Sequence, residues 1–211
     1  MGVQVLHPPK RGTLAYLEAF PNEVLTMSLE EYWENERQNA YKSTFFQNKV
    51  TAIMPHTSEN HNRISRRFVV ALSDAIEEQG KELFYETRPV WIEQSELNTY
   101  PDINTVEKSE KFVFRGDQVA EIAPSVVIEI LSNSTEGHDK GKKLRYYKTI
   151  PSLQQIVLVA QNEPVVDMYE KNAEGKWVYT DYMGFKEKIV VSGVELSLAT
   201  IYKNINFDEP N

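Results

Sequence analysis

Two acidic residues in apolar, strand-like stretches are the residues of this sequence best suited to chemistry. Glu129 interrupts the apolar run over 125–132, and Asp102 follows Pro101 in a second predicted strand over 100–106. An ionised carboxylate is costly in a dry interior, so a strand that keeps one usually offers it to a cation, a partner or a cleft. Carboxylates from neighbouring strands can hold Mg²⁺ together with water and a substrate phosphate. The pair therefore favours metal-assisted hydrolysis of a phosphodiester bond.

A helix predicted after the strand of Glu129 carries a third candidate, Lys143. Asp139, Lys143 and Tyr147 are spaced at i, i+4 and i+8, which places them on one face of a helix. A lysine near the carboxylates could orient or deprotonate an attacking water and offset phosphate charge. The alternative is a solvated pair of Asp139 and Lys143, worth about 0.2–0.5 kcal/mol, with Tyr147 turned toward the sheet. The spacing alone favours neither interpretation.

The charge of the chain argues against binding DNA through a generally basic surface. The formal net charge is −8, whereas nonspecific affinity for DNA depends on Lys and Arg side chains that neutralise phosphates. Two local basic clusters are candidate contacts, although each could also be the solvated face of an amphipathic helix. The nucleic-acid-binding candidates are Lys140, Lys142, Arg145 and Arg63. His61, near the start of a predicted helix, is more typical of a surface or capping position and is kept as a supporting site candidate.

Length and composition predict one domain in a reducing compartment. The chain has 211 residues, of which 41% are apolar, enough for one substantial core. It has no cysteine, so neither a disulfide framework nor a thiolate metal site can form. The N-terminus has no long apolar run, and we expect a cytoplasmic protein that does not enter a membrane.

The order of the predicted elements indicates an α/β fold. Ser28 and Glu31 form a capping box that opens a short helix, and apolar residues recur every four positions in a longer helix over 58–79. Strands are predicted over 50–54, 83–92, 100–106, 125–132, 155–160, 165–169 and 177–182, with a charged loop over 107–123 and short strand and helix pieces over 196–202. We expect a mixed central sheet flanked by helices, with additional β-hairpins. An N-terminal arm over 1–22 and a C-terminal tail over 206–211 are expected to flank it.

Three motifs together resemble the Uma2-like endonuclease family (DUF820), a branch of the PD-(D/E)XK nuclease superfamily. They are Pro101-Asp102-Ile103, Val127-Ile128-Glu129-Ile130-Leu131-Ser132 and Asp139-x-x-x-Lys143-x-x-x-Tyr147, and the resemblance covers residues 23–205. It implies a restriction-endonuclease-like core and Mg²⁺-dependent (or Mn²⁺-dependent) cleavage of phosphodiester bonds. We therefore expect nucleic acid, in the first place DNA, as the partner, and a homodimer is one expected arrangement.

The same resemblance implies roles for individual residues. Asp102 and Glu129 match the metal ligands, and Lys143 matches the catalytic lysine, which the superfamily pattern would place at Leu131. A long side chain from a packed helix can reach a metal site at a strand edge, so this shift in position is physically reasonable. The supporting candidates are Asp139, Tyr147, His61 and Ser132.

One departure from the family pattern leaves a second interpretation open. Relatives carry an acidic residue before the strand at Val50, where this sequence has Thr44. The alternative to an active endonuclease is therefore a catalytically weakened nuclease fold that acts as a nucleic-acid-binding or protein-interaction module. A small-molecule phosphoesterase is a third interpretation, which would need a closed pocket in place of an open basic groove.

Overall fold

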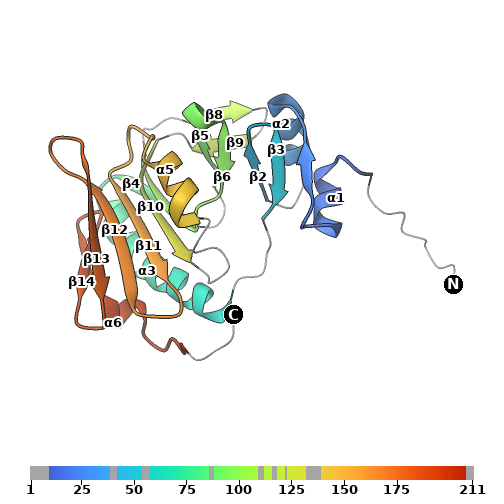
Figure 1. Cartoon of the computed structure of the whole chain (residues 1–211). Coiled ribbons are helices and arrows are strands. Elements are labelled where there is room, and N and C mark those ends of the chain that lie inside the picture. The colour runs from blue at the N-terminus through green and yellow to red at the C-terminus, as the bar shows by residue number, and fades with distance from the viewer. Residues whose placement is uncertain are drawn as a thin grey trace.

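A mixed six-stranded sheet forms the centre of the protein (Figure 1). The structure is a computed structural model that describes residues 10–38, 42–53, 58–85, 88–108, 112–115, 118–121, 123–131 and 139–207. The strand order is β13-β12-β11-β10-β7-β4, and β10 pairs in parallel with β11, while all other neighbours in this sheet are antiparallel. The strands are β4 (Lys81–Tyr85), β7 (Ile103–Glu107), β10 (Pro124–Leu131), β11 (Gln155–Ala160), β12 (Val165–Lys171) and β13 (Trp177–Met183).

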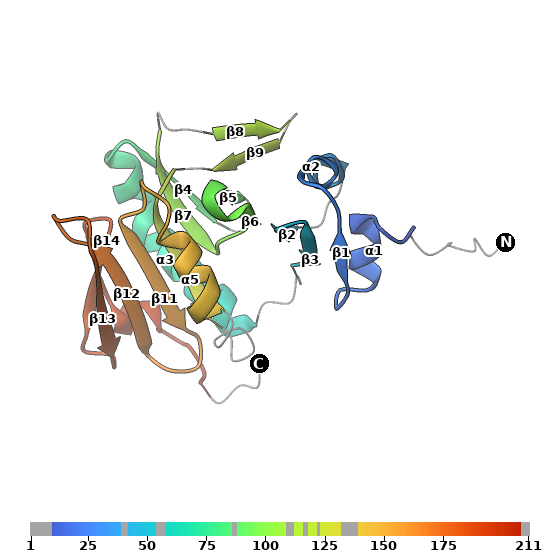
Figure 2. The ribbon, with the colours of Figure 1, turned by 45° about the horizontal axis from the view of Figure 1, so that its top comes forward.

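Helices cover both faces of this sheet, as Figure 2 shows. The long helix α3 (Glu59–Glu78) packs on the face of β10 that carries Ile128, and the short helix α5 (Leu144–Tyr147) packs on the face that carries Val127. A π-helical turn, η2 (Asp139–Lys143), leads directly into α5. Every residue of β10 is buried, because its two faces both lie under helices. The predicted mixed α/β fold is thereby confirmed.

Local signals all agree along α3, which is the helix predicted over 58–79. The Ser58 hydroxyl caps its first turn by accepting the His61 N–H at 3.1 Å. Its apolar positions recur every four residues and are fully buried, and they are Ile64, Phe68, Leu72 and Ile76. Gly80 follows with φ at +76°, a conformation in which glycine commonly ends a helix.

A second sheet, of seven strands, lies beside the central one and has its own core. Its order is β1-β3-β2-β6-β5-β9-β8. The strands are β1 (Val24–Thr26), β2 (Ser43–Phe46), β3 (Lys49–Ala52), β5 (Val90–Ile92), β6 (Leu97–Thr99), β8 (Phe112–Arg115) and β9 (Gln118–Glu121). Helices α1 (Leu14–Ala19) and α2 (Leu29–Gln38) pack against β2 and β3 through a core that includes Tyr32, Phe45 and Trp91. The predicted capping box opens α2, since Ser28 N–H donates to the Glu31 carboxylate at 2.8 Å.

The C-terminal elements close the core on the α3 side of the central sheet. A hairpin of β14 (Lys188–Val191) and β15 (Val194–Ser197) leads into α6 (Leu198–Ile201), and all three contribute to the core around α3. A 3₁₀ turn, η1 (Glu93–Ser95), connects β5 and β6. Within the part of the chain that the structure describes, no helix is long and apolar enough to cross a membrane.

Three predicted segments differ from the structure. The single strand predicted over 83–92 is two strands in different sheets, because β4 pairs with β7 whereas β5 pairs with β6. The loop predicted over 107–123 contains the antiparallel hairpin of β8 and β9. The arm predicted over 1–22 contains α1, whose Leu14 and Leu17 are buried. The change of sheet between β4 and β5 and the packing of α1 on β3 depend on contacts that local periodicity does not report. The β8–β9 hairpin is local, but it lies in a charged stretch without clear alternation.

Replacing Phe68 with Ala should lower the free energy of unfolding by about 3–5 kcal/mol, because it empties a fully buried site between α3 and the sheet. Val70→Ala on the same helix is the matched control, since Val70 is 74% exposed and should change stability by no more than about 0.5 kcal/mol. Urea denaturation of both variants checks this. Equal losses in the two variants would contradict the packing face assigned to α3.

Candidate functional site

Glu129 lies at the centre of the site and receives two hydrogen bonds on one carboxylate oxygen. The side chain projects from β10 toward α5 and is 8% exposed. Lys143 Nζ lies 2.7 Å from Glu129 Oε1, and the Tyr147 hydroxyl donates to the same oxygen at 2.5 Å. The predicted helix face therefore brings Lys143 and Tyr147 together on Glu129. Oε2 makes neither of these contacts.

The backbone that presents Lys143 is unusual. Lys143 is the last residue of the π-helical turn η2, and Tyr147 follows four residues later at the end of α5. Single π-helical turns occur frequently at functional sites. Tyr147 is fully buried in the core between α5 and the sheet, so its ring fixes the helix and its hydroxyl reaches the carboxylate. Lys143 is thereby held with its ammonium at the buried acid.

Asp102 stands next to Glu129 on the neighbouring strand. Ile103 pairs with Ile128 in the antiparallel ladder of β7 and β10, and Asp102 lies one position beyond its end. Its Oδ2 accepts the Ile130 N–H at 2.6 Å, and its Oδ1 lies 3.2 Å from His61 Nε2. The Asp102 side chain thus adds one hydrogen bond beyond the last residue pair of the β7–β10 ladder. Its other carboxylate oxygen faces the start of α3.

Burial and charge set the protonation of this group of residues. Burial raises the pKa of Glu129 to about 7; the Lys143 ammonium opposes this rise and the negative charge of Asp102 adds to it. Burial and the neighbouring Glu129 carboxylate raise the pKa of Tyr147 well above its ordinary range, so the phenol stays a hydrogen-bond donor. Glu129 is therefore poised to change charge near neutral pH.

The donor set fits a hard divalent cation that keeps much of its own water. Among the described residues no group of three or more His, Cys, Asp or Glu side chains could form a metal cage. Mg²⁺ in proteins commonly takes only one or two carboxylates and completes its shell with water and phosphate. Asp102 and Glu129 are the residues that could hold such an ion, because they lie beside each other at one end of the ladder of β7 and β10.

Among the described residues, no carboxylate joins Thr44 in the lining of the open side of β2. The buried acid Glu36 of α2 accepts hydrogen bonds from the neighbouring Ser43 Oγ at 2.6 Å and from the Tyr100 hydroxyl at 2.7 Å. Side chains alternate along a strand, so Ser43 and Thr44 point to opposite faces of β2. Glu36 therefore belongs to the core side of β2, and Thr44 to the open side.

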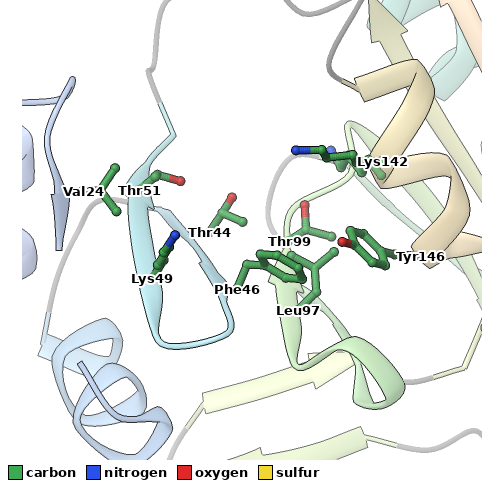
Figure 3. Close-up of a pocket in the computed structure, with 10 residues that line it drawn as sticks. Val24, Thr44, Phe46, Lys49, Thr51, Leu97, Thr99, Lys142 and Tyr146 are labelled. Atoms are coloured by element: carbon green, nitrogen blue, oxygen red, sulfur yellow. The ribbon is translucent and has the colours of Figure 1, made fainter. Parts of the chain in front are cut away.

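A cleft of about 510 Å³ leads from the open side of β2 to Lys143 (Figure 3). One wall is formed by the second sheet and the other by the π-helical turn and α5. The lining residues are Val24, Thr44, Phe46, Lys49, Thr51, Leu97, Thr99, Lys142, Lys143 and Tyr146. Lys143 belongs both to this lining and to the Glu129 contact, so the cleft reaches the residue that contacts the buried carboxylate.

The predicted nucleic-acid contacts are not gathered in one place. Lys142 lines the cleft, and Arg145 is exposed on α5 outside the lining. Arg63 lies on α3, where it pairs with Glu59 at 2.9 Å and donates to the Asn204 carbonyl at 3.0 Å. The side chains of Asp139 and Lys140, and all of Ser132, lie outside the described residues.

Sequence patterns did not identify most of the cleft lining. Phe46 and Lys49 flank the two-residue turn of the β2–β3 hairpin, where Gln47 and Asn48 both have positive φ. Asn48, which lies between two short strand-like segments, is a local sequence feature that predicts such a hairpin turn. No comparable local signal marks Thr99, which reaches the cleft only because β6 pairs with β2.

Comparisons with known proteins give one family match, two relatives and a solved structure of the same fold. Residues 29–200 match the sequence model of the Uma2 family, described as "Putative restriction endonuclease". The chain is 34% identical to the uncharacterized protein sll1609 of Synechocystis sp. over 79% of this chain and 93% of that protein. It is 29% identical to slr1290 of the same organism, over 86% and 94% respectively. A crystal structure from Anabaena variabilis, of a "putative nuclease belonging to DUF820", has the same fold, with a TM-score of 0.62 and 20% identity over 81% of this chain and 96% of that one.

The raised pKa of Glu129 predicts a pH dependence of stability in the presence of EDTA. The folded protein holds this proton up to about pH 7, whereas the unfolded chain releases it near 4.5. The folded state therefore binds more protons between these values, and the free energy of unfolding should fall as pH rises through this window. Glu129→Gln should remove that contribution. Urea denaturation at several pH values checks this, and a difference between wild type and variant that is constant with pH would contradict it.

Proposed function

The chain belongs to the Uma2 family, and from that premise we propose that it is a metal-dependent endonuclease that hydrolyses phosphodiester bonds in DNA. The observation that carries this proposal is the contact of Lys143 with Glu129, beside Asp102 and at the end of a cleft lined with lysines. These are the residue types that phosphodiester hydrolysis requires. Acidic residues can hold a cation, and a fixed ammonium can stabilise charge on the reacting phosphate.

Asp102 and Glu129 are the residues that would hold Mg²⁺ or Mn²⁺. Such an ion, when bound, supplies a water of lowered pKa and neutralises charge that develops on the phosphate oxygens. The protein's own groups fix the two carboxylates. The Tyr147 hydroxyl orients Glu129 through Oε1, while the Ile130 N–H and His61 hold Asp102. His61 and Tyr147 are accordingly positioning residues in this proposal.

Lys143 is the residue proposed to act on the attacking water or the scissile phosphate. Its ammonium lies between the buried Glu129 and the cleft, so a phosphate that enters the cleft meets this charge beside the carboxylates. The contact with Glu129 also restricts the flexible lysine side chain before substrate binds, which lowers the entropic cost of using it. A lysine at position 131, where the superfamily pattern would place it and this chain has Leu131, would therefore not be needed for this role.

Thr44 supports a second candidate function, a nuclease fold that binds nucleic acid without efficient cleavage. The cleft wall at this position carries a hydroxyl where relatives carry an acid, and Glu36 faces the other side of β2. With one carboxylate fewer, the site would bind a cation more weakly. Cleavage and metal binding therefore have to be measured separately.

Glu129→Gln should abolish Mg²⁺-dependent cleavage of a plasmid, with a loss of roughly 100-fold or more. Glu174→Gln is the matched control, because Glu174 lies in an exposed turn far along the chain from the site and should cleave like the wild type. Equal cleavage by wild type and Glu129→Gln would exclude this site as its source.

Mg²⁺ should also raise the melting temperature of the wild type but not that of Asp102→Asn. A metal response without cleavage would favour the second candidate function.

Lys143→Met and Lys142→Met should affect different kinetic constants although each removes one positive charge. Lys143 contacts Glu129, so its loss should lower kcat by roughly 100-fold. Lys142 lines the cleft and should mainly raise KM, because it contributes to phosphate binding in substrate and transition state alike. Steady-state cleavage of a fluorescent oligonucleotide checks both. The same rise in KM with unchanged kcat in both variants would reduce Lys143 to a binding residue.

A further inference from the structure

The cleft beside Glu129 has an internal chemistry that differs from the rest of the molecule. The chain carries a net charge of −8, yet the lining, as far as the described residues form it, contains three lysines, Lys49, Lys142 and Lys143, and no acidic side chain. Such a local reversal of charge favours an anionic ligand. The lysines stand on both walls, because Lys49 begins β3 and Lys142 lies in the π-helical turn.

An aromatic surface lies between these lysines. Phe46 of β2 and Tyr146 of α5 both line the cleft, and their ring centroids are 5.2 Å apart at an interplanar angle of 43°. Since the rings contact each other, a ligand cannot insert between them and must lie on the surface that they share. Figure 3 shows both side chains beside Leu97 and Thr99. Aromatic rings that alternate with basic groups are the usual means of holding unpaired bases and their phosphates.

The volume of the cleft favours an unpaired nucleotide over a nucleic acid duplex. Its volume of about 510 Å³ falls in the range of roughly 300–1,000 Å³ that pockets for small ligands occupy. It therefore suits a nucleotide-sized group and not the body of a duplex. Inside a duplex the faces of the bases are covered by their neighbours, so the surface of Phe46 and Tyr146 can reach a base only after it leaves the stack.

On the basis of the proposed nuclease function, we propose that the preferred substrate is a single-stranded or locally unpaired nucleic acid strand. One unpaired base stacks on Phe46 and Tyr146, and the flanking phosphates lie at Lys49 and Lys142. The strand then continues toward Lys143, where the adjoining phosphodiester bond meets the carboxylate site. The threonine hydroxyls of the lining, from Thr44, Thr51 and Thr99, are available to hydrogen-bond the base edge or the sugar.

Binding of fluorescein-labelled oligonucleotides in EDTA, followed by anisotropy, tests this proposal without cleavage. A single strand should bind at least about 10-fold more tightly than a blunt duplex of the same sequence, and a duplex with a central unpaired bubble should approach the single strand. DNA and RNA strands form two arms, and binding of either supports the proposal. Equal affinity for single strand and duplex, or no binding of either strand type, would overturn it.

Matched variants assign the effect to the cleft. Tyr146→Phe keeps the ring and should keep the affinity for single strands, whereas Tyr146→Leu should lose roughly 10-fold. Tyr179→Leu is the control, because Tyr179 is an exposed aromatic residue of β13, outside the cleft lining. Retained affinity in Tyr146→Leu would overturn the aromatic role, and melting curves establish that each variant is folded. If Tyr146→Leu proves unfolded, Phe46→Leu takes its place with the same expected loss.

The preference for unpaired strands and the proposed nuclease activity can be tested separately. Cleavage in Mg²⁺ is measured on the same three substrates. Cleavage of duplex and single strand at equal rates, with equal binding, would leave the endonuclease in place and remove the preference for unpaired strands. Tight binding of single strands without cleavage of any substrate would overturn the nuclease function and leave the binding preference in place.

Discussion

The contact between the buried Glu129 carboxylate and the Lys143 ammonium is the interaction on which the site depends. A buried acid without a partner is costly, and the loss of one partner of such a pair is more costly than the pair is stabilising. Lys143 and Tyr147 both meet this requirement from one helical segment. That segment is short, since η2 has five residues and α5 has four, and such a helix is not stable on its own. The carboxylate therefore holds the helix in place as much as the helix holds the lysine.

The second sheet forms one wall of the cleft, opposite the π-helical turn and α5. A buried polar network lies on the core side of β2 in this wall. The Tyr32 hydroxyl donates to the Ser43 carbonyl at 2.9 Å and accepts from Asn98 Nδ2 at 2.7 Å, and Glu36 accepts from Ser43 and Tyr100. Burial raises the pKa of Glu36. These hydrogen bonds join α2 to β2 and β6 and favour one arrangement of the strands in the cleft wall, while the buried Asn98 Oδ1 has no hydrogen-bond partner among the described residues.

Sequence patterns were sufficient wherever the determining contacts are local or repeat along one element. The helix α3 could be predicted because its cap, its apolar stripe and its terminal glycine agree, and β10 because both of its faces are apolar. The spacing of Lys143 and Tyr147 placed them on one face of a helix, but it could not say which carboxylate they would reach. That depends on the parallel pairing of β10 and β11, which fixes where the connecting segment crosses the sheet.

Apart from the local hairpin of β8 and β9, the features that escaped prediction depend on pairing or contact between separate segments of the chain. Leu83 and Val90 belong to similar apolar patterns, yet they pair with Thr105 and Thr99 in different sheets. The cleft is a stronger case, because β1, β2, β3, β6, η2 and α5 each contribute one or two residues to it, and apart from the segment that carries Lys143 none has a motif of its own. The aromatic contact of Phe46 with Tyr146 joins positions a hundred residues apart, which no local period can reveal.

The hydrogen bond from the Ile130 N–H to Asp102 has a consequence for how this family can diverge. The backbone amide of a buried strand needs an acceptor, and beyond the last paired rung of β7 that acceptor is the Asp102 side chain. Substitution of Asp102 by an apolar residue would leave the amide unsatisfied and weaken the fold itself. A lineage that no longer needed catalysis would thus still be selected to keep this aspartate or an asparagine in its place. An intact aspartate at this position is therefore a sign of the fold and not by itself a sign of activity.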